Sequence, residues 1–262
     1  MNLLITGVAG FIGYSLTKEI IKKKHQVFGI DLSINKLKNI NKDRIKELKM
    51  NSDSTKEVSS SEFKLSKNIS FSSNIEDIIN CNIYIVTVPT PIDEFNKPDL
   101  NPLKSASETI GNILKNDDIV IYESTVFPGC TEEVCVPILE KFSNLKFNND
   151  FFVGYSPERI VPGDKINTIT KIVKVTSGSN KKIADIIDKL YSSIITAGTF
   201  KAPNIKTAEA SKAIENAQRD INISFVNELA LIFDKIGIDT NDVLDAAATK
   251  WNFIKYQPRC SN

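Results

Sequence analysis

The chain has 262 residues, of which 41% are hydrophobic and 25% are charged, and its formal net charge at pH 7 is +1. This composition is ordinary for a soluble globular protein of one large or two small domains with a sizeable core. Acidic and basic residues are interspersed and no apolar run has the length of a membrane span, so we expect neither a nucleic-acid nor a membrane partner.

Cysteine and histidine are scarce in this sequence. The four cysteines are irregularly spaced without a CxxC pair, and there is one histidine, so we expect neither a disulfide framework nor a metal site. The N-terminus, MNLLITGVAG, enters a strand-like run at once and lacks the basic start of a signal peptide. Together these features predict a cytoplasmic protein.

Short apolar runs alternate with helical patterns over the first 200 residues. The apolar runs are rich in β-branched and aromatic residues, which predicts buried strands at 2–6, 26–31, 81–88, 118–124, 151–155 and 171–175. Helices are predicted between them at 12–24, 102–115, 131–142 and 181–191, and residues 33–68 fit one or two surface helices. This alternation indicates an α/β fold, a Rossmann-like, doubly wound and mostly parallel sheet.

A different pattern begins at residue 204. Small and apolar residues recur there at helical spacing, without Gly or Pro until Gly237, which predicts one long helix. A further short helix is expected over 238–249. A long helix in this position is either an ordinary core helix or a connection between domains or subunits.

A glycine-rich turn joins the first strand to the first helix. Its sequence, TGVAGFIG, contains Gly7, Gly10 and Gly13, which let the backbone approach a pyrophosphate at a helix N-terminus. Asp31 ends the second strand, 18 residues after Gly13, where a carboxylate binds ribose hydroxyls and repels the 2′-phosphate of NADP. We therefore predict NAD binding, with contacts from Gly7, Gly10, Phe11, Ile12, Gly13 and Asp31. The alternative is a glycine-rich turn without a ligand.

The spacing of these glycines resembles the start of the extended short-chain dehydrogenase/reductases, the nucleotide-sugar epimerases. Those enzymes use a Tyr-x-x-x-Lys pair, in which the lysine lowers the pKa of the tyrosine so that it acts as acid and base. The only such pair here is Tyr14 and Lys18, within the first predicted helix and away from any plausible substrate position. An epimerase-like protein is therefore an alternative hypothesis.

Six motifs carry a second and more specific resemblance. In order they are YIVTVPTPID (84–93), PDLNPL (98–103), IYESTVFPGCTEE (121–133), GYSPERIVPGDK (154–165), AEASKAIENAQRDINI (208–223) and TKWNF (249–253). They resemble the UDP-glucose/GDP-mannose dehydrogenase family, nearest to the bacterial UDP-N-acetylhexosamine 6-dehydrogenases of surface-polysaccharide synthesis, over about residues 43–257. The first forty or so residues depart from the GxGxxG of that family, as if grafted from an epimerase or diverged towards one.

The resemblance implies a chemistry for particular residues. The family oxidises C6 of a nucleotide sugar twice with two NAD+, through an aldehyde and a cysteine-bound thioester that water hydrolyses. Thr125 matches the threonine that positions a water and contacts the cofactor, and Glu158 matches the acid/base glutamate of thioester hydrolysis. Lys212 and Asn216 lie four residues apart on the long helix and match the pair that stabilises the alkoxide and the thioester oxyanion. Without the resemblance, these would be a strand-capping hydroxyl and solvated side chains.

The same resemblance implies further contacts and partners. Cofactor contacts are expected from Thr87, Pro89, Thr90 and Ser124, and the two prolines of VTVPTP would stiffen that turn. The expected small-molecule partner is a UDP-sugar. The helix around Ala208–Lys235 is apolar around much of its circumference, so we also expect a homodimer through it.

The end of the chain, KWNFIKYQPRCSN, bears on activity. In the resembling family this run continues into a glycine-rich loop with the nucleophilic cysteine, an aspartate and a C-terminal UDP-binding domain. Cys260 lacks that glycine-rich context, and Cys130 and Cys135 match no nucleophile and are expected in the core. We therefore expect a truncated, catalytically impaired dehydrogenase, with a non-catalytic remnant that binds NAD or dimerises as a further hypothesis. The expected domains are 1–200, an NAD-binding Rossmann-like domain, and 201–262, a connecting helix with a truncated central helical domain.

Overall fold

The computed structural model describes residues 2–8, 10–23, 25–30, 69–72, 80–161, 164 and 166–258. The chain divides into two compact units, Met1–Ala210 and Ser211–Asn262. The predicted division into domains 1–200 and 201–262 stays a prediction. The long helix begins in the first unit and continues into the second.

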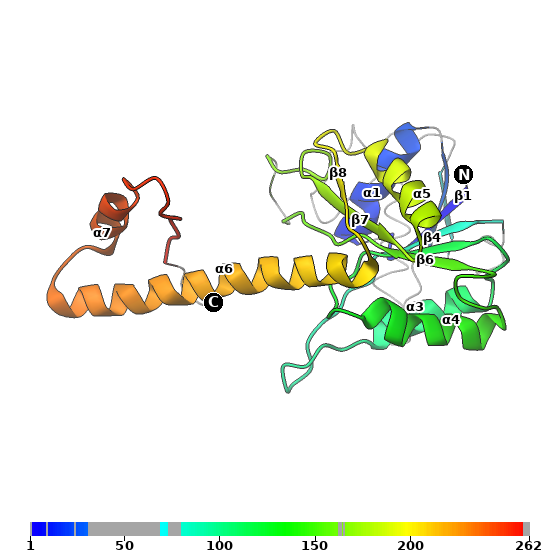
Figure 1. Cartoon of the computed structure of the whole chain (residues 1–262), viewed down its shortest axis with the longest axis horizontal. Helices are drawn as coiled ribbons and strands as arrows, with labels where there is room; N and C mark the ends of the chain where they lie inside the picture. Colours follow the sequence, from blue (N-terminus) through cyan, green and yellow to red (C-terminus); the bar gives the residue numbers. More distant parts are fainter. Residues whose placement is uncertain are drawn as a thin grey trace. The chain divides into compact units, whose positions relative to one another are not determined.

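The first unit is built on one sheet with helices on both faces (Figure 1). Among the described residues, its strands are β1 (Asn2–Thr6), β2 (Gln26–Ile30), β3 (Ile69–Ser72), β4 (Ile83–Val86), β5 (Ile119–Tyr122), β6 (Phe152–Tyr155), β7 (Lys174–Gly178) and β8 (Thr199–Lys201). Their order is β3-β2-β1-β4-β5-β6-β7-β8, and every neighbouring pair is parallel except β6 and β7. The predicted Rossmann-like, mostly parallel sheet is confirmed.

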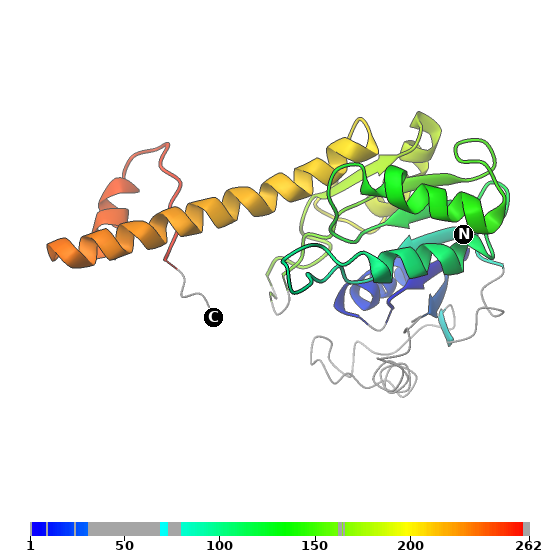
Figure 2. The same cartoon turned by 90° about the horizontal axis from the view of Figure 1, so that it is seen from below.

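Helices cover both faces of this sheet. They are α1 (Phe11–Lys22), α3 (Asn101–Gly111), the π-helical turn η2 (Thr131–Cys135), α4 (Val136–Ser143) and α5 (Lys181–Ser192). Figure 1 shows α1 and α5 on one face and α3 and α4 on the other, and Figure 2 shows α3 and α4 side by side. Parallel strands require crossover connections, because the chain must go back to the end of the sheet where each strand starts before it forms the next one. Helices make these connections and cover the two faces.

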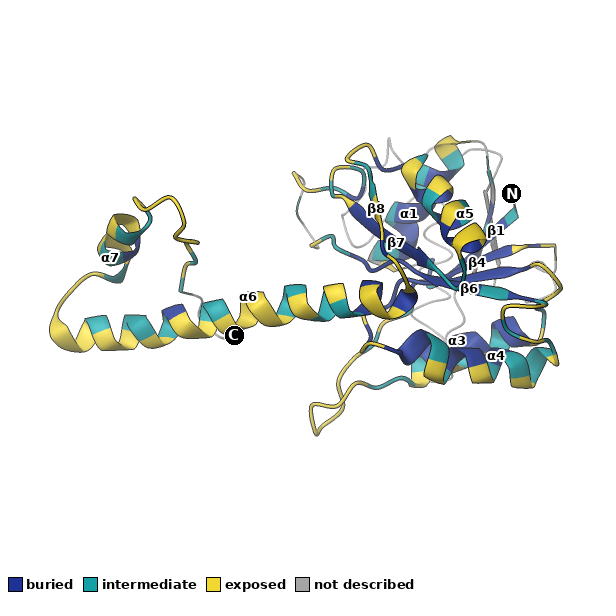
Figure 3. Cartoon of the chain, in the orientation of Figure 1, coloured by how far each residue is buried: buried dark blue, intermediate teal, exposed yellow. Residues whose placement is uncertain are grey.

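Two apolar layers enclose the sheet, one on each face. Successive side chains of a strand point to opposite faces of the sheet. Because both faces are covered, the central strands β4 and β5 are buried along their whole length (Figure 3). Leu4 and Tyr84 pack in the layer of α3 and α4. Leu3 and Ile85, their immediate neighbours, pack in the layer of α1 and α5. This alternation explains why the strands read as continuous apolar runs in the sequence.

One strand lies later than predicted, and two strands were not predicted. The run KIVKV suggested a strand at 171–175, but β7 begins at Lys174 and continues through polar residues. Two of these are buried because their hydroxyls have acceptors: Thr176 Oγ1 donates to Asp188 and Ser177 Oγ donates to the Tyr155 carbonyl. The missed strands β3 and β8 are short and partly polar, so neither gives a periodic apolar signal.

The second unit contains most of α6 (Ile205–Ile236) and all of α7 (Thr240–Ala247), which confirms both predicted helices. Gly237 ends α6 with a φ of +75°, a left-handed conformation that glycine adopts without strain. Asp239 caps α7, since its carboxylate accepts hydrogen bonds from the amides of Asn241 and Asp242. The segment after α7 returns to α6, where the Tyr256 hydroxyl contacts the side chain of Gln218.

Candidate functional site

The glycine turn between β1 and α1 is closed by its own backbone. Gly7 has a φ of +70°, and its carbonyl accepts the amide of Gly10 at 2.9 Å. A Cβ on Gly13 would lie 2.5 Å from the Gly7 oxygen and 2.8 Å from Thr87 Oγ1, so only glycine fits there. Gly10 is exposed, and a Cβ there would meet the Gly7 oxygen alone, at 3.1 Å. The turn is therefore closely packed at Gly13 and accessible to solvent at Gly10, so a dinucleotide phosphate can approach its backbone.

Thr87 joins this turn to the end of β4. Its hydroxyl is buried and donates to the carbonyl of Thr6, the last residue of β1, at 2.6 Å. The sheet order reverses between β1 and β4, since the chain runs outward from β1 to β3 and then returns to β4. Open α/β sheets bind ligands at such a switch point, beyond the carboxyl ends of the strands. The predicted residues Gly7, Gly13 and Thr87 therefore lie together where this fold places a ligand.

Two side-chain hydrogen bonds connect the end of β4 to the end of β5. Ser124 Oγ donates to the Val88 carbonyl at 2.6 Å, and Thr90 Oγ1 donates to the Thr125 carbonyl at 2.8 Å. Ser124 is buried by this contact, whereas Thr125 and Pro89 are exposed. The Thr125 side chain therefore faces away from the core, on a turn whose backbone is fixed.

Some predicted cofactor residues are described only in part. Ile12 is half-buried in the first turn of α1, directly after the glycine turn. Phe11 begins this helix, but its side chain lies outside the described residues, as do Asp31 and Cys260. The assignments of Phe11, Asp31 and Cys260 therefore stay predictions from the sequence.

Glu158 is buried, not solvated. It follows β6 and is 8% exposed. Its Oε1 accepts the amides of Arg159 and Ile160, each at 2.7 Å, so the carboxylate folds back onto its own turn. Its amide contacts the Glu123 carbonyl at 3.4 Å, which brings the SPER turn beside the β5 turn that carries Thr125. The structure thus brings these two predicted catalytic residues onto neighbouring turns.

Three buried groups around Glu158 were not predicted. Lys174 Nζ lies 2.8 Å from Glu123 Oε2 and 3.6 Å from Glu158 Oε2, and the Tyr191 hydroxyl donates to Glu123 Oε1. Burial raises the pKa of Glu123, and Lys174 offsets this only in part. Burial disfavours the charge on Lys174, but the two carboxylates outweigh it and raise the pKa of this lysine. The sequence offered one sign of this cluster: Lys174 is a charged residue within the apolar run KIVKV, which was predicted to form a buried strand.

A further buried acid, Glu209, connects the amino-terminal part of α6 to the segment after β5. Its carboxylate accepts the amide of Gly129 at 2.5 Å and that of Thr131 at 2.9 Å. Burial raises the pKa of Glu209, although these donors favour its ionised form. The Glu209 side chain is completely buried, and the sequence alone showed no sign that it would be. Glu209 therefore fixes the far end of the turn that begins with Ser124 and Thr125.

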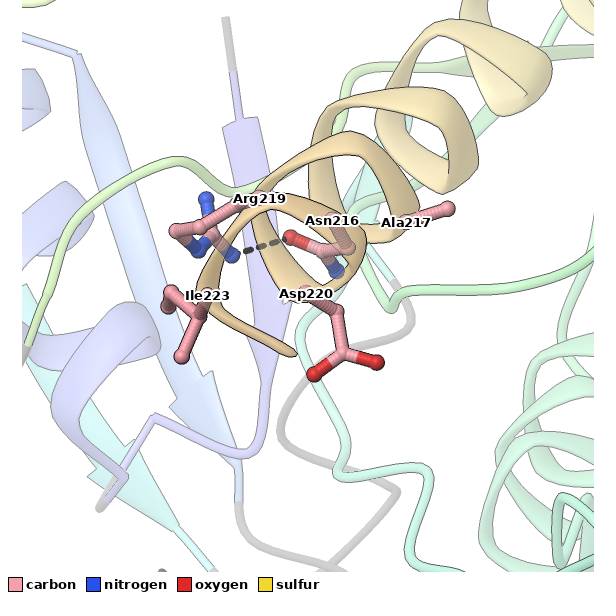
Figure 4. Close-up of a pocket in the computed structure, with 5 residues that line it drawn as sticks. All are labelled: Asn216, Ala217, Arg219, Asp220 and Ile223. Atoms are coloured by element: carbon pink, nitrogen blue, oxygen red, sulfur yellow. Dashed lines mark hydrogen bonds between the residues drawn. The ribbon is translucent and has the colours of Figure 1, made fainter. Parts of the chain in front are cut away.

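The other two predicted catalytic residues, Lys212 and Asn216, belong to the second unit. Lys212 Nζ lies 3.7 Å from Glu215 Oε1, and its side chain is 11% exposed. Asn216 Oδ1 accepts a hydrogen bond of 2.7 Å from Arg219 Nη2 (Figure 4). Because its carbonyl oxygen is engaged by Arg219, the Asn216 amide nitrogen is left as the group that can donate to a ligand.

Asn216 also lines a hollow on the surface of α6. The lining residues are Asn216, Ala217, Arg219, Asp220 and Ile223 (Figure 4). The hollow combines an amide, a guanidinium, a carboxylate and one apolar side chain along a single helix face. Side chains of this kind can form hydrogen bonds with a polar ligand, and the catalytic role of Asn216 stays a prediction from the sequence.

The described cysteines are free thiols. Cys130 and Cys135 are completely buried in the core, as expected. Within the described ranges, no group of three His, Cys, Asp or Glu side chains is placed to hold a metal ion. No helix in that part of the chain is long and apolar enough to cross a membrane.

Comparison with known proteins identifies both parts of the chain. The model of the UDP-glucose/GDP-mannose dehydrogenase family, NAD binding domain, matches residues 1–195, and that of the family's central domain matches residues 206–260. The chain is 57% identical to the UDP-N-acetyl-D-glucosamine 6-dehydrogenase of Pseudomonas aeruginosa, covering 98% of this chain and 59% of that protein. It is 52% identical to protein CapL of Staphylococcus aureus, covering 98% of this chain and 58% of the relative.

A solved structure agrees with these matches. The UDP-D-ManNAc dehydrogenase of Pyrococcus horikoshii superimposes with a TM-score of 0.86 at 28% identity, covering 98% of this chain and 60% of that one. The chain thus spans about three-fifths of the length of its relatives. The family match begins at residue 1, so the epimerase-like glycine spacing lies inside the dehydrogenase NAD-binding domain and the resemblance extends beyond the 43–257 suggested by the motifs.

Proposed function

Because the chain belongs to the UDP-glucose/GDP-mannose dehydrogenase family, we propose that it provides the NAD and C6 half of a UDP-sugar 6-dehydrogenase of surface-polysaccharide synthesis. The proposed substrate is a UDP-N-acetylhexosamine, in keeping with the names of its relatives. The observation that carries the proposal is the meeting of the glycine turn, Thr87 and the Thr125 turn at the switch point of the sheet.

The cofactor half of the proposal rests on the glycine turn. Gly10 leaves open space before the amino end of α1, and the tight packing of Gly13 against Gly7 keeps that turn in shape. We assign the pyrophosphate of NAD to this turn, the ribose hydroxyls to Asp31, and further cofactor contacts to Thr87, Thr90 and Ser124 with their neighbours. NAD bound in this way supplies the hydride acceptor.

The chemical half of the proposal assigns a role to each polar group. The Asn216 amide and the Lys212 ammonium donate hydrogen bonds to the C6 oxygen as it becomes negatively charged. Thr125, exposed at the end of a fixed turn, orients a water molecule. Glu158 is assigned the acid/base role in hydrolysis of a thioester, where it accepts a proton from water. A second oxidation through a thioester requires a cysteine nucleophile, and for Cys260 we propose no such role.

Assembly and location complete the proposal. Large apolar side chains of α6 in the second unit are more than half exposed: Ile214, Ile221, Phe225, Leu231, Ile232 and Ile236. Large apolar side chains exposed along one helix are unfavourable in water, and a second copy of the chain would bury them, so we propose a homodimer through the helix around Ala208–Lys235. The cysteines at 81, 130 and 135 are unpaired, which is consistent with a cytoplasmic location.

The experiment separates cofactor binding from chemistry. NADH fluorescence titration should show binding that is weakened in Asp31→Ala, with weaker binding of NADPH to the unmodified chain. In the presence of NAD+ and UDP-N-acetylglucosamine, slow NADH formation should be lost in Lys212→Ala and unchanged in Cys260→Ser. The absence of NADH binding would contradict the cofactor assignment, and turnover that depends on Cys260 would contradict the assignment of that residue.

A further inference from the structure

We infer that Lys174 is a positioning residue for Glu158, supplying its counter-charge and fixing the turn on which it stands, and that Glu123 holds Lys174 in place. The inference rests on the proposed function, in which Glu158 accepts a proton. Neither Lys174 nor Glu123 is among the residues that the family resemblance assigned to the reaction. The two residues enter through the geometry of the buried cluster alone.

The cluster joins four elements of the first unit. Glu123 directly follows β5, Glu158 follows β6, Lys174 is the first residue of β7, and Tyr191 lies in α5. Glu123 and Tyr191 are completely buried, Lys174 is 3% exposed and Glu158 is 8% exposed. Buried charges are strongly unfavourable unless they are paired and hydrogen-bonded, so each member of the cluster depends on the others.

The ammonium of Lys174 has three N–H donors, and each has a partner. They go to Glu123 Oε2 at 2.8 Å, the Pro157 carbonyl at 3.2 Å and the Ser156 carbonyl at 3.4 Å. Ser156 and Pro157 are the two residues immediately before Glu158. Lys174 therefore clamps the backbone that leads into Glu158, in addition to pairing with Glu123.

Glu158 receives the charge of Lys174 but no hydrogen bond from it. The contact between Lys174 Nζ and Glu158 Oε2 is 3.6 Å, and among the described residues Oε2 has no hydrogen-bond partner. The other oxygen, Oε1, is occupied by the amides of Arg159 and Ile160. Oε2 thus keeps its lone pairs for a proton and lies beside the positive charge of Lys174.

Glu123 and Tyr191 keep the ammonium fixed. Glu123 binds Lys174 through one oxygen and accepts the Tyr191 hydroxyl with the other, and Lys174 Nζ also lies 5.3 Å from the centre of the Tyr191 ring. The charged groups that face Lys174 are therefore Glu123 from β5 and Glu158 from the β6 turn, with the tyrosine of α5 completing the enclosure. Both carboxylates favour the charged form of the lysine.

The test removes the positive charge without leaving a buried charge unpaired. Lys174→Met alone would strand the Glu123 carboxylate, so the variant is the double change Glu123→Gln with Lys174→Met, in which the glutamine can still accept the Tyr191 hydroxyl. The readout is hydrogen exchange, followed by NMR without NAD or sugar, at the amides of Arg159 and Ile160, which donate to Glu158 Oε1. Without Lys174 to hold the Ser156 and Pro157 carbonyls, these two amides should exchange about tenfold faster in the double variant.

Controls separate a positioning role from a structural one. Glu123→Gln alone retains the ammonium and its contacts with the two carbonyls, so exchange at Arg159 and Ile160 should stay close to that of the unmodified chain. The amide of Gly129, which Glu209 holds, should exchange equally in all variants and reports any general loosening. Unchanged exchange at Arg159 and Ile160 in a double variant with the melting temperature of the unmodified chain would overturn the inference. If the double variant does not fold, 15N NMR of the unmodified chain decides: the inference requires a protonated Lys174 Nζ throughout the neutral range, and a neutral amine there would overturn it.

The exchange measurements also distinguish this inference from the proposed function. They need neither cofactor nor substrate, so they report only on the turn that carries Glu158. If exchange responds as expected but the chain does not bind NADH, the proposed function fails and the positioning role of Lys174 stands. If the chain binds NADH as proposed and exchange does not respond, the positioning role of Lys174 fails alone.

Discussion

Replacing Glu209 by glutamine removes a buried carboxylate that accepts two backbone hydrogen bonds. The glutamine oxygen can accept only one of the amides of Gly129 and Thr131, because its NH2 group must face the other. One buried backbone N–H and one amide N–H then lose their acceptors, at about 1–3 kcal/mol each. Burial raises the pKa of Glu209, so the carboxylate itself carries a desolvation cost that glutamine avoids. We therefore expect a net loss of about 2 kcal/mol.

The assay is urea unfolding followed by far-ultraviolet circular dichroism. With a denaturant slope of about 2 kcal/mol per molar, this loss lowers the unfolding midpoint by about 1 M. Glu133→Gln is the matched control, since Glu133 belongs to the same loop but forms an exposed ion pair with Lys206. An exposed pair contributes little, so the control should unfold close to the unmodified chain. Equal midpoints for the two variants would refute the view that Glu209 holds this loop.

The remaining predictions concern pH and assembly. Burial raises the pKa of Tyr84 and Tyr155, so their stabilisation is complete below the ordinary tyrosine value and is lost as the pH rises through the folded-state values. The melting temperature should therefore fall above about pH 10 and fall less steeply in Tyr84→Phe; a flat profile to about pH 12 would contradict this. Light scattering at micromolar concentration should show a dimer, which Phe225→Asp on the exposed face of α6 should dissociate. A monomeric unmodified chain would contradict the proposed homodimer.

The parts of the site that follow from local sequence could be predicted, and the parts that depend on strand order could not. Gly13 is required by contacts within its own turn, so its spacing from Gly7 shows in the sequence. Lys174 is different, because its partner Glu123 lies 51 residues earlier and meets it only after β5, β6 and β7 are placed side by side. The placement of β7 was wrong for another reason: the strand continues through Thr176 and Ser177, which are polar but buried, and does not include the apolar residues Ile172 and Val173.

The hydrogen bonds of Glu209 could not be predicted from the sequence either. Glu209 is 80 residues from Gly129 in the chain, and a charged residue on a helix is ordinarily assigned to the solvent, so its burial beside Ile205 and Ala208 was not predicted. The family resemblance located the motifs that contain Glu209 and Glu123, but it assigned roles to their neighbours. Long-range pairing of polar groups is a property of the fold, and one sequence without its relatives does not display it.

The turn after β5 explains why the site needs these buried acids. A loop at the carboxyl edge of a sheet cannot be fixed by ladder hydrogen bonds, and amides that become buried there still require acceptors. Glu123 precedes Thr125 and is held by Lys174, while Glu209 receives the amides of Gly129 and Thr131 beyond it. Thr125 therefore projects from a segment whose two ends are anchored by charged groups. Such anchoring holds a reacting group in place more narrowly than an exposed loop would. Because Glu123 anchors through Lys174, the fixing of Thr125 and the counter-charge of Glu158 come from one ion pair, and removing Lys174 together with the Glu123 charge should alter both turns together.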